Sequence, residues 1–394
     1  MVVSAVVVIS ALTVAMAGPA MSFFIPPMQT DLGLGMVYFG IAFSARQLGF
    51  ALMGPILGRL TDRFGARPLL VLVGIIAAGV VYTLSLVENE WHLIALLAIL
   101  GLIGLQGAGG DLYGSVVIAK WFAPAQRGYA MSVAFLGLPL GVFLFMPLTQ
   151  WSIDTLGWQT AWQYIGLLGG GLIVLAAAFI KPPPALDEAS PDSANPVDLT
   201  VHWSRAEALR SAAFWKVCVS FGLLMFTISS VAMFRVPHFL NSGFAADSIA
   251  LAFSSEAIFS IGTASVMGWL IARFQIRHLT AIAFTMPVWM LVLTIYADAL
   301  WILYASVAVF GIGAASCIIL QNTIWPAYFG SEHIGAIRGI SMPVTLGFAV
   351  IGAPLAGWVN DISGSFVPIW WAAIGSMVVA IFLIVTTPKP NRHQ

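Results

Sequence analysis

Four ionisable residues lie inside long apolar stretches of the sequence: Arg46, Asp111, Arg235 and Glu256. A charge at bilayer depth costs roughly 2.5–3.5 kcal/mol on insertion scales, so such residues indicate a functional site. Arginines bind anionic groups through bidentate, charge-assisted hydrogen bonds. Carboxylates at this depth can carry protons, or neutralise the arginines when a bound anion leaves. These residue types therefore favour reversible binding of a small anion.

We predict that Arg46 and Arg235 bind this anion, and that Asp111 and Glu256 couple its binding to protonation. Two alternatives compete with these roles. Arg235 and Glu256 fall at similar depth on consecutive predicted helices, so they can form an ion pair that serves structure only. Asp111 can likewise pair with Arg46 and never titrate.

Three uncharged polar residues also lie within predicted helices, namely Tyr113, Gln321 and Asn322. We predict that they hydrogen-bond the anion, and the alternative is that they join neighbouring helices.

The sequence has no pattern typical of an enzyme or a metalloprotein. Its two cysteines, Cys218 and Cys317, lie far apart in apolar stretches, and its six histidines do not pair at metal-site spacing. Gly-rich phosphate loops and nucleophile elbows are absent. We therefore expect no catalytic residues, no cofactor and no metal.

The elements that position these residues must lie mostly in lipid. Of the 394 residues, 60% are hydrophobic and only 8% are charged, against about 25% charged residues in soluble proteins. So few charges cannot cover a water-facing surface. The formal net charge is +0, which gives no reason to expect nucleic acid as a partner.

Long apolar segments, each near the ~20 residues that cross a bilayer, alternate with short polar breaks. We predict an all-α membrane protein with twelve transmembrane helices in two six-helix halves. The expected helices are roughly 4–28, 36–58, 69–87, 92–119, 128–150, 160–180, 214–240, 248–272, 279–297, 300–326, 339–360 and 367–387. The halves are 1–180 and 214–394, and a Pro-rich cytoplasmic linker, 181–213, separates them, with a surface helix expected over 203–215.

Loop charges give the orientation. The loop Lys and Arg residues all fall on the side that holds the loop after the second predicted helix. The other side carries acidic residues instead, among them Asp31, Asp247, Asp298 and Asp361. The positive-inside rule then places the basic side and both termini in the cytoplasm. We expect a multi-pass protein of the cell's inner (plasma) membrane.

The two halves carry similar segments at equivalent places. Residues 58–67 align with 268–277, where Gly, Leu, Arg, Phe and Arg coincide, and 127–141 align with 338–352. A parallel repeat of two six-helix halves is a known transporter architecture.

The segment Gly58-Arg-Leu-Thr-Asp62-Arg63-Phe-Gly65-Ala-Arg67 resembles the signature of the major facilitator superfamily, in the loop between the second and third helices. The resemblance covers nearly the whole chain and implies a transporter that works by alternating access. It also implies a gate, in which Asp62 pairs with a basic residue near helices four and five, for which Arg127 is the candidate, and faces the N-terminus of helix eleven. The expected gating residues are Gly58, Asp62, Arg63, Arg67 and Arg127, and the alternative is that these arginines only set topology.

Shorter segments are similar to the monocarboxylate porter and oxalate/formate antiporter families. They include 120–128, 237–243 and 352–366. Those families carry an arginine in helix eight, whereas Gly262–Gly268 here has no basic residue, and Ile103 stands where many facilitators have arginine. The families' usual anion site is therefore not present intact.

We predict a secondary active transporter of small organic anions, above all monocarboxylates, acting by symport or antiport. The alternatives are an efflux carrier for amphipathic compounds and a transporter-like receptor without flux. The expected partners are the anionic substrate, protons and the lipid bilayer, and we expect a monomer.

Overall fold

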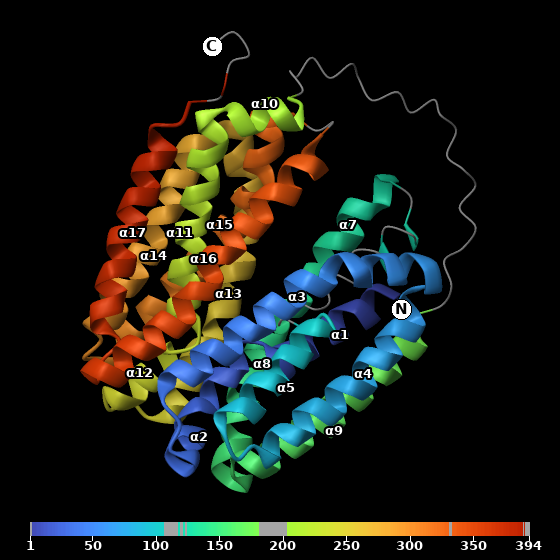
Figure 1. The fold of residues 1–394 in the computed structure, drawn as a ribbon, viewed down its shortest axis with the longest axis vertical. Coiled ribbons are helices and arrows are strands. Elements are labelled where there is room, and N and C mark those ends of the chain that lie inside the picture. The colour runs from blue at the N-terminus through green and yellow to red at the C-terminus, as the bar shows by residue number, and fades with distance from the viewer. Residues whose placement is uncertain are drawn as a thin grey trace. The chain divides into compact units, whose positions relative to one another are not determined.

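The computed structural model describes residues 2–105, 117–118, 121–122, 124–180, 203–330, 333–388 and 390, without the side chains at 62, 124–125 and 127–128. The helices are α1 (Val2–Ala17), η1 (Pro19–Phe23), α2 (Ile25–Leu32), α3 (Met36–Phe64), α4 (Ala66–Thr83), η2 (Leu84–Leu86), α5 (Glu90–Leu102), α7 (Pro124–Phe135), α8 (Gly137–Leu156), α9 (Trp158–Ala178), α10 (Arg205–Arg210), α11 (Ala212–Ala232), α12 (Arg235–Asn241), α13 (Ala246–Arg273), α14 (Ile276–Ile295), α15 (Leu300–Phe329), α16 (Ile334–Ser363) and α17 (Val367–Val385), as Figure 1 shows.

Eleven helical stretches of the described chain are long and apolar enough to cross a membrane. The twelfth predicted helix, 92–119, begins as α5, and its residues 106–116 lie outside the described chain. The prediction of an all-helical membrane protein is confirmed, and eleven of its spans lie in the described part of the chain.

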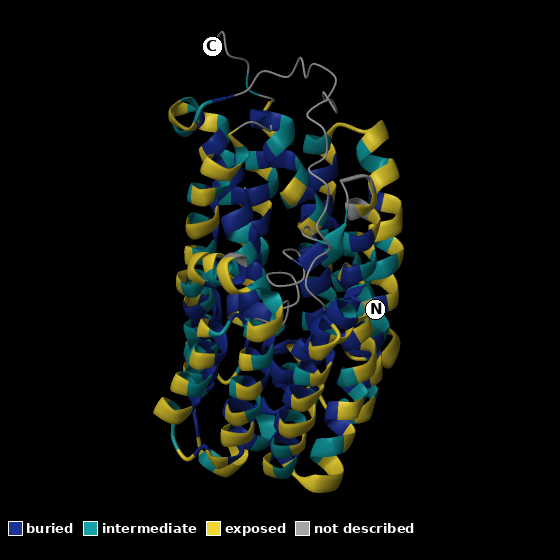
Figure 2. Cartoon of the chain, turned by 90° about the vertical axis from the view of Figure 1, so that its right-hand side faces the viewer, coloured by how far each residue is buried: buried dark blue, intermediate teal, exposed yellow. Residues whose placement is uncertain are grey.

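The outward faces of the helices are apolar, which a lipid environment requires. In Figure 2, residues coloured as exposed recur along the helices. Large hydrophobic side chains are among them, for example Leu52 at 71% exposed and Trp91 and Trp301 at 70% each. Such exposure would be unfavourable in water, so these faces are lipid-facing.

The first of two compact units comprises residues 1–186, 232–258 and 353–366. Within it, α1 packs against α8 and α9, α3 packs against α5, and α4 lies along α9 (Figure 1). Glycines allow the close approach of α4 and α9, since a Cβ at Gly166 would lie 2.7 Å from the backbone nitrogen of Tyr82. Small residues at helix contacts are typical of packing in membranes.

The second unit comprises residues 187–231, 259–352 and 367–394. In it, α14 packs against α15 and α17. Aromatic rings form much of its core, with Phe221 and Phe284 at 5.2 Å between ring centroids and Phe214 and Trp325 at 5.6 Å. These units group the chain by contact, so the division into halves at 181–213 stays a prediction.

Two predicted helices are interrupted. The first expected helix, 4–28, is divided into α1, η1 and α2, because Pro19, Pro26 and Pro27 each lack the N–H that a continuous helix needs. The expected helix 214–240 is divided into α11 and α12. Pro237 follows that break and cannot donate a hydrogen bond to the carbonyl four residues earlier.

The expected loop over 58–67 is mostly helical. Helix α3 continues to Phe64, Gly65 with φ 83° forms the break, and α4 begins at Ala66. Only glycine adopts this backbone conformation without strain, so one residue suffices for the turn. The expected surface helix over 203–215 is shorter, α10, and a capping box of Ser204 and Glu207 starts it.

Candidate anion site

Arg46 lies in the first half of α3 and is buried, with 3% of its surface exposed. Its Nη1–H donates to the Met21 Sδ at 3.5 Å, and its guanidinium carbon lies 4.7 Å from the centroid of the Phe43 ring. Among the residues that the structure describes, no carboxylate forms an ion pair with Arg46, and its Nε–H has no hydrogen-bond acceptor. The guanidinium is therefore a buried cation with donors to spare.

The backbone around Arg46 is held closely against α5. A Cβ at Gly101 would overlap the carbonyl oxygen of Arg46, and a Cβ at Gly49 would lie 2.8 Å from the carbonyl oxygen of Ala98. These two glycines let α3 and α5 meet backbone to backbone. The next residue, Gln47, is 6% exposed, and its Nε2 has no acceptor within the described part of the chain. Two adjacent polar side chains thus have N–H donors without an acceptor among the described residues.

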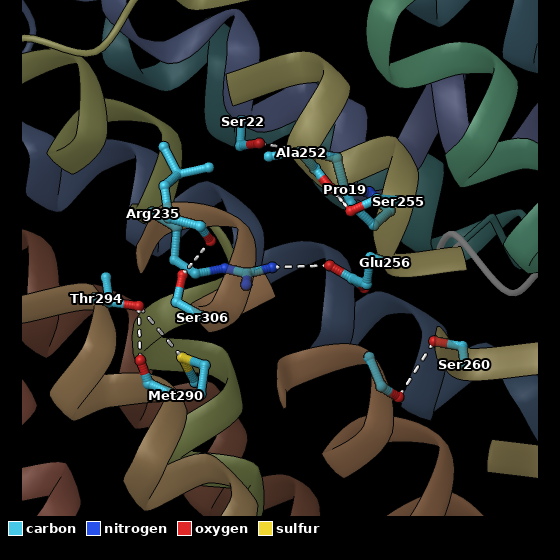
Figure 3. A network of polar contacts seen from close by, with 12 residues as sticks. Pro19, Ser22, Arg235, Ala252, Ser255, Glu256, Ser260, Met290, Thr294 and Ser306 are labelled. Atoms are coloured by element: carbon cyan, nitrogen blue, oxygen red, sulfur yellow. Dashed lines mark hydrogen bonds and ion pairs between the residues drawn. The ribbon is translucent and has the colours of Figure 1, made fainter. Parts of the chain in front are cut away.

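Arg235, the first residue of α12, contacts the carboxylate of Glu256 in α13 (Figure 3). Its Nη2–H donates to the Glu256 Oε2 at 3.1 Å, and the two side chains are 3% and 13% exposed. The guanidinium carbon also lies 4.4 Å from the centroid of the Phe253 ring. The structure therefore brings these two sequence-predicted residues together, and the charge of each compensates the other.

The short helix η1 contacts the surroundings of both arginines within the first unit. Met21 of η1 contacts Arg46, whereas Phe23 of η1 packs edge-on against Phe253 with 6.0 Å between ring centroids. A cavity of about 20 Å³ beside Met21 is lined by apolar side chains, including Phe24, Trp162 and Met233. This volume is enough for about one water molecule. The short helix η1 of the interrupted first span thus contacts Arg46 directly and contacts Phe253, which lies against Arg235.

The remaining predicted site residues lie in the second unit or outside the described residues. Gln321 and Asn322 lie in α15, where the Asn322 Oδ1 accepts a hydrogen bond from the Arg338 Nη2 at 2.8 Å. Asp111 and Tyr113 lie outside the described residues. The pairing of Asp111 with Arg46 therefore stays a prediction, as do the roles of Gln321 and Asn322.

The predicted gating residues lie on the last turns of α3, on α4 and on α7. Gly58 and Arg63 are in α3, where the Arg63 guanidinium carbon lies 5.2 Å from the Phe64 ring centroid, and Arg67 is exposed in α4. The side chains of Asp62 and Arg127 lie outside the described residues. The proposed pairing of Asp62 with Arg127 stays a prediction.

Sequence reasoning missed the apolar partners of the two arginines. Met21 and Phe253 are apolar residues in apolar segments, so neither type nor spacing distinguishes them from lipid-facing neighbours. The Gly18-Pro19 pair was the available signal, since it interrupts the helix next to Met21.

Buried charges within a bundle of apolar spans indicate a functional site in a membrane protein. The model of the Major Facilitator Superfamily matches residues 3–345. The chain therefore belongs to the Major Facilitator Superfamily, as the motif at 58–67 indicated.

Curated relatives include transporters of organic anions. The oxalate:formate antiporter of Oxalobacter formigenes is 28% identical over 248 residues, which are 62% of this chain and 56% of that one. The chain thus aligns with little more than half the length of this relative. Monocarboxylate transporter 13 of Bos taurus is 23% identical over 353 residues, 88% of this chain and 79% of that one. The narrower resemblance to these two families is confirmed.

Solved structures share the fold. The nucleoside transporter NupG superimposes with a TM-score of 0.74 and 16% identity, covering 99% of this chain and 100% of that one. The bacterial homologue of the human lysosomal transporter Spinster superimposes with a TM-score of 0.71 and 14% identity. The match covers 98% of this chain and 94% of that one. At this identity the comparison shows the fold alone.

Proposed function

We propose that this protein is a secondary active transporter of small organic anions, chiefly monocarboxylates, and that Arg46 binds the carboxylate. The observation that supports this is the burial of the Arg46 guanidinium without a carboxylate partner among the described residues. A buried cation is costly unless an anion pairs with it. A carboxylate substrate supplies that charge only while it is bound, which is what a carrier requires.

Arg235 has a different part in this proposal. Its positive charge is already compensated by Glu256 at 3.1 Å, so it adds little net charge to attract an anion. We infer that the pair takes part in coupling instead: protonation of Glu256 would free the guanidinium, and loss of the proton would restore the pair. Asp111 remains the second coupling candidate.

The relatives support an anion as substrate. Their names include an oxalate:formate antiporter, monocarboxylate transporters and a hexuronate transporter of Bacillus subtilis, the last aligned over 42% of this chain. All these names describe carriers of carboxylates.

A counterflow experiment in proteoliposomes tests the substrate class. Vesicles are loaded with an unlabelled carboxylate and diluted into a solution of the same carboxylate in labelled form. The carboxylates tested are acetate, lactate, oxalate and glucuronate. We expect transient accumulation of at least one monocarboxylate, which an excess of another carboxylate inhibits. Counterflow of a neutral or cationic amphipathic compound, with none of any carboxylate, would instead support an efflux carrier.

We also propose that both termini and the linker 181–213 face the cytoplasm. Reporter fusions after residue 186 and after residue 388 are expected to report a cytoplasmic location, because loop Lys and Arg residues favour the cytoplasm. A fusion after Asp298 is expected to report the opposite side of the membrane. Alkaline phosphatase and green fluorescent protein activities measure the two locations. High phosphatase activity of the linker fusion would contradict the proposed orientation.

A further inference from the structure

A carboxylate near the C-terminal end of α16 caps the N-terminus of α3. The Asp361 Oδ1 accepts the Met36 backbone N–H at 2.7 Å, and its Oδ2 accepts the Val37 N–H at 2.9 Å. Met36 and Val37 are the first two residues of α3, whose N–H groups have no partner inside the helix. A negative charge there is also stabilised by the positive end of the helix dipole. Both segments belong to the first compact unit.

The backbones of the two helices meet at the same place. A Cβ at Gly357 of α16 would overlap the carbonyl oxygen of Met36, and a Cβ at Gly40 of α3 would overlap the carbonyl oxygen of Ala353. At Gly35, a Cβ would lie 2.7 Å from the Asp361 Oδ2. Three glycines thus make room for the contact, which we name the Asp361 cap.

The C-terminal ends of α3 and α16 have the same local structure. Asp361 is followed after two residues by Gly364 with φ 70°, and Asp62 of α3 is followed after two residues by Gly65 with φ 83°. The Gly364 N–H donates to the Asn360 carbonyl at 2.7 Å, and the Gly65 N–H donates to the Thr61 carbonyl at 3.0 Å. Each helix therefore ends in the same Asp-x-x-Gly turn, with one carboxylate at its last turn.

We propose that the Asp361 cap is a conformational lock on the side of the membrane that lacks basic loops. This inference rests on the proposed alternating access. In the present conformation Asp361 holds the ends of α3 and α16 together. Opening of this side must break both hydrogen bonds.

A cysteine reporter measures this opening without any substrate. Ser254 of α13 is 6% exposed and belongs to the same unit, so Ser254→Cys in a Cys218→Ser, Cys317→Ser background reports access to a buried position. A membrane-impermeant maleimide is added from the side of Asp361. We expect Asp361→Asn to increase the labelling rate about threefold to tenfold, as the loss of a charge–dipole contact at a surface permits.

Matched variants separate a lock from a merely stabilising contact. Asp247 is an exposed carboxylate in the first turn of α13. Asp247→Asn removes the same charge from the same unit, and we expect no increase in the labelling rate. Gly35→Ala keeps the charge but displaces the Asp361 carboxylate, and is expected to increase labelling as Asp361→Asn does. Thermal unfolding confirms that each variant is folded. Unchanged labelling in folded Asp361→Asn and Gly35→Ala would overturn the lock, whatever the counterflow experiment shows about carboxylates.

Discussion

Replacing Arg46 with Gln is expected to lower carboxylate transport about 100-fold or more while the protein still inserts and folds. Each hydrogen bond to a charged group contributes about 1.5–3 kcal/mol, and the substitution removes two from the bound carboxylate. Folding is spared because no described carboxylate depends on Arg46 for its charge balance. Removal of a buried cation that no described carboxylate compensates leaves no charge unpaired among the described residues. Counterflow rates and calorimetric titration with the transported carboxylate measure the two effects.

Two controls accompany Arg46→Gln. Arg46→Lys keeps the charge but cannot form the bidentate contact, so we expect intermediate affinity. Arg59→Gln changes an exposed arginine of the same helix, whose Nε–H donates to the Pro55 carbonyl at 3.3 Å, and should leave transport near that of the wild type. If Arg46→Gln binds the carboxylate with unchanged affinity, the anion site lies elsewhere.

The second large effect concerns stability. Arg235→Gln leaves the buried Glu256 carboxylate without its ion pair, which is expected to cost about 3–5 kcal/mol of folding free energy. Glu256→Gln leaves the guanidinium uncompensated and should cost a similar amount. The double variant restores neutrality, so its midpoint of thermal unfolding should return close to that of the wild type.

Transport by the stable double variant then distinguishes coupling from structure. Retained carboxylate exchange without accumulation in response to a proton gradient would support a coupling role for Glu256. Accumulation at the wild-type level would assign the pair to structure only. If the single variants unfold at the wild-type temperature, the pair contributes nothing measurable and the stability argument is wrong.

The sequence predicted the fold well, because membrane insertion leaves few options. Each span must be a helix of about twenty apolar residues, and length and hydropathy locate it. The positions at which helices are interrupted were harder to predict from the sequence. The break before α12 depends on how neighbouring helices accommodate Pro237, and a proline within a membrane helix does not by itself determine whether that helix continues.

The candidate site was predictable only in its charged members. Arg46 and Arg235 stand out because charge is rare in apolar segments, and the pairing of Arg235 with Glu256 was one of two stated alternatives. The contact of Asp361 with Met36 joins residues 325 positions apart, and nothing local in either segment indicates it. Long-range contacts of this kind depend on how helices pack in three dimensions, which a single sequence does not encode in its spacing.

The position of Arg46 has a consequence for biogenesis. Its span, Met36–Thr61, has a mean hydropathy of 1.3, the lowest of the eleven candidate spans in the described chain. A central arginine opposes transfer from the translocon into lipid by roughly 2.5–3.5 kcal/mol. Partition of α3 by itself is therefore marginal, and the backbone contact with α5 forms only after α5 has been synthesised. We infer that α3 is retained near the translocon until α5 arrives, so the two helices enter the bilayer as a pair.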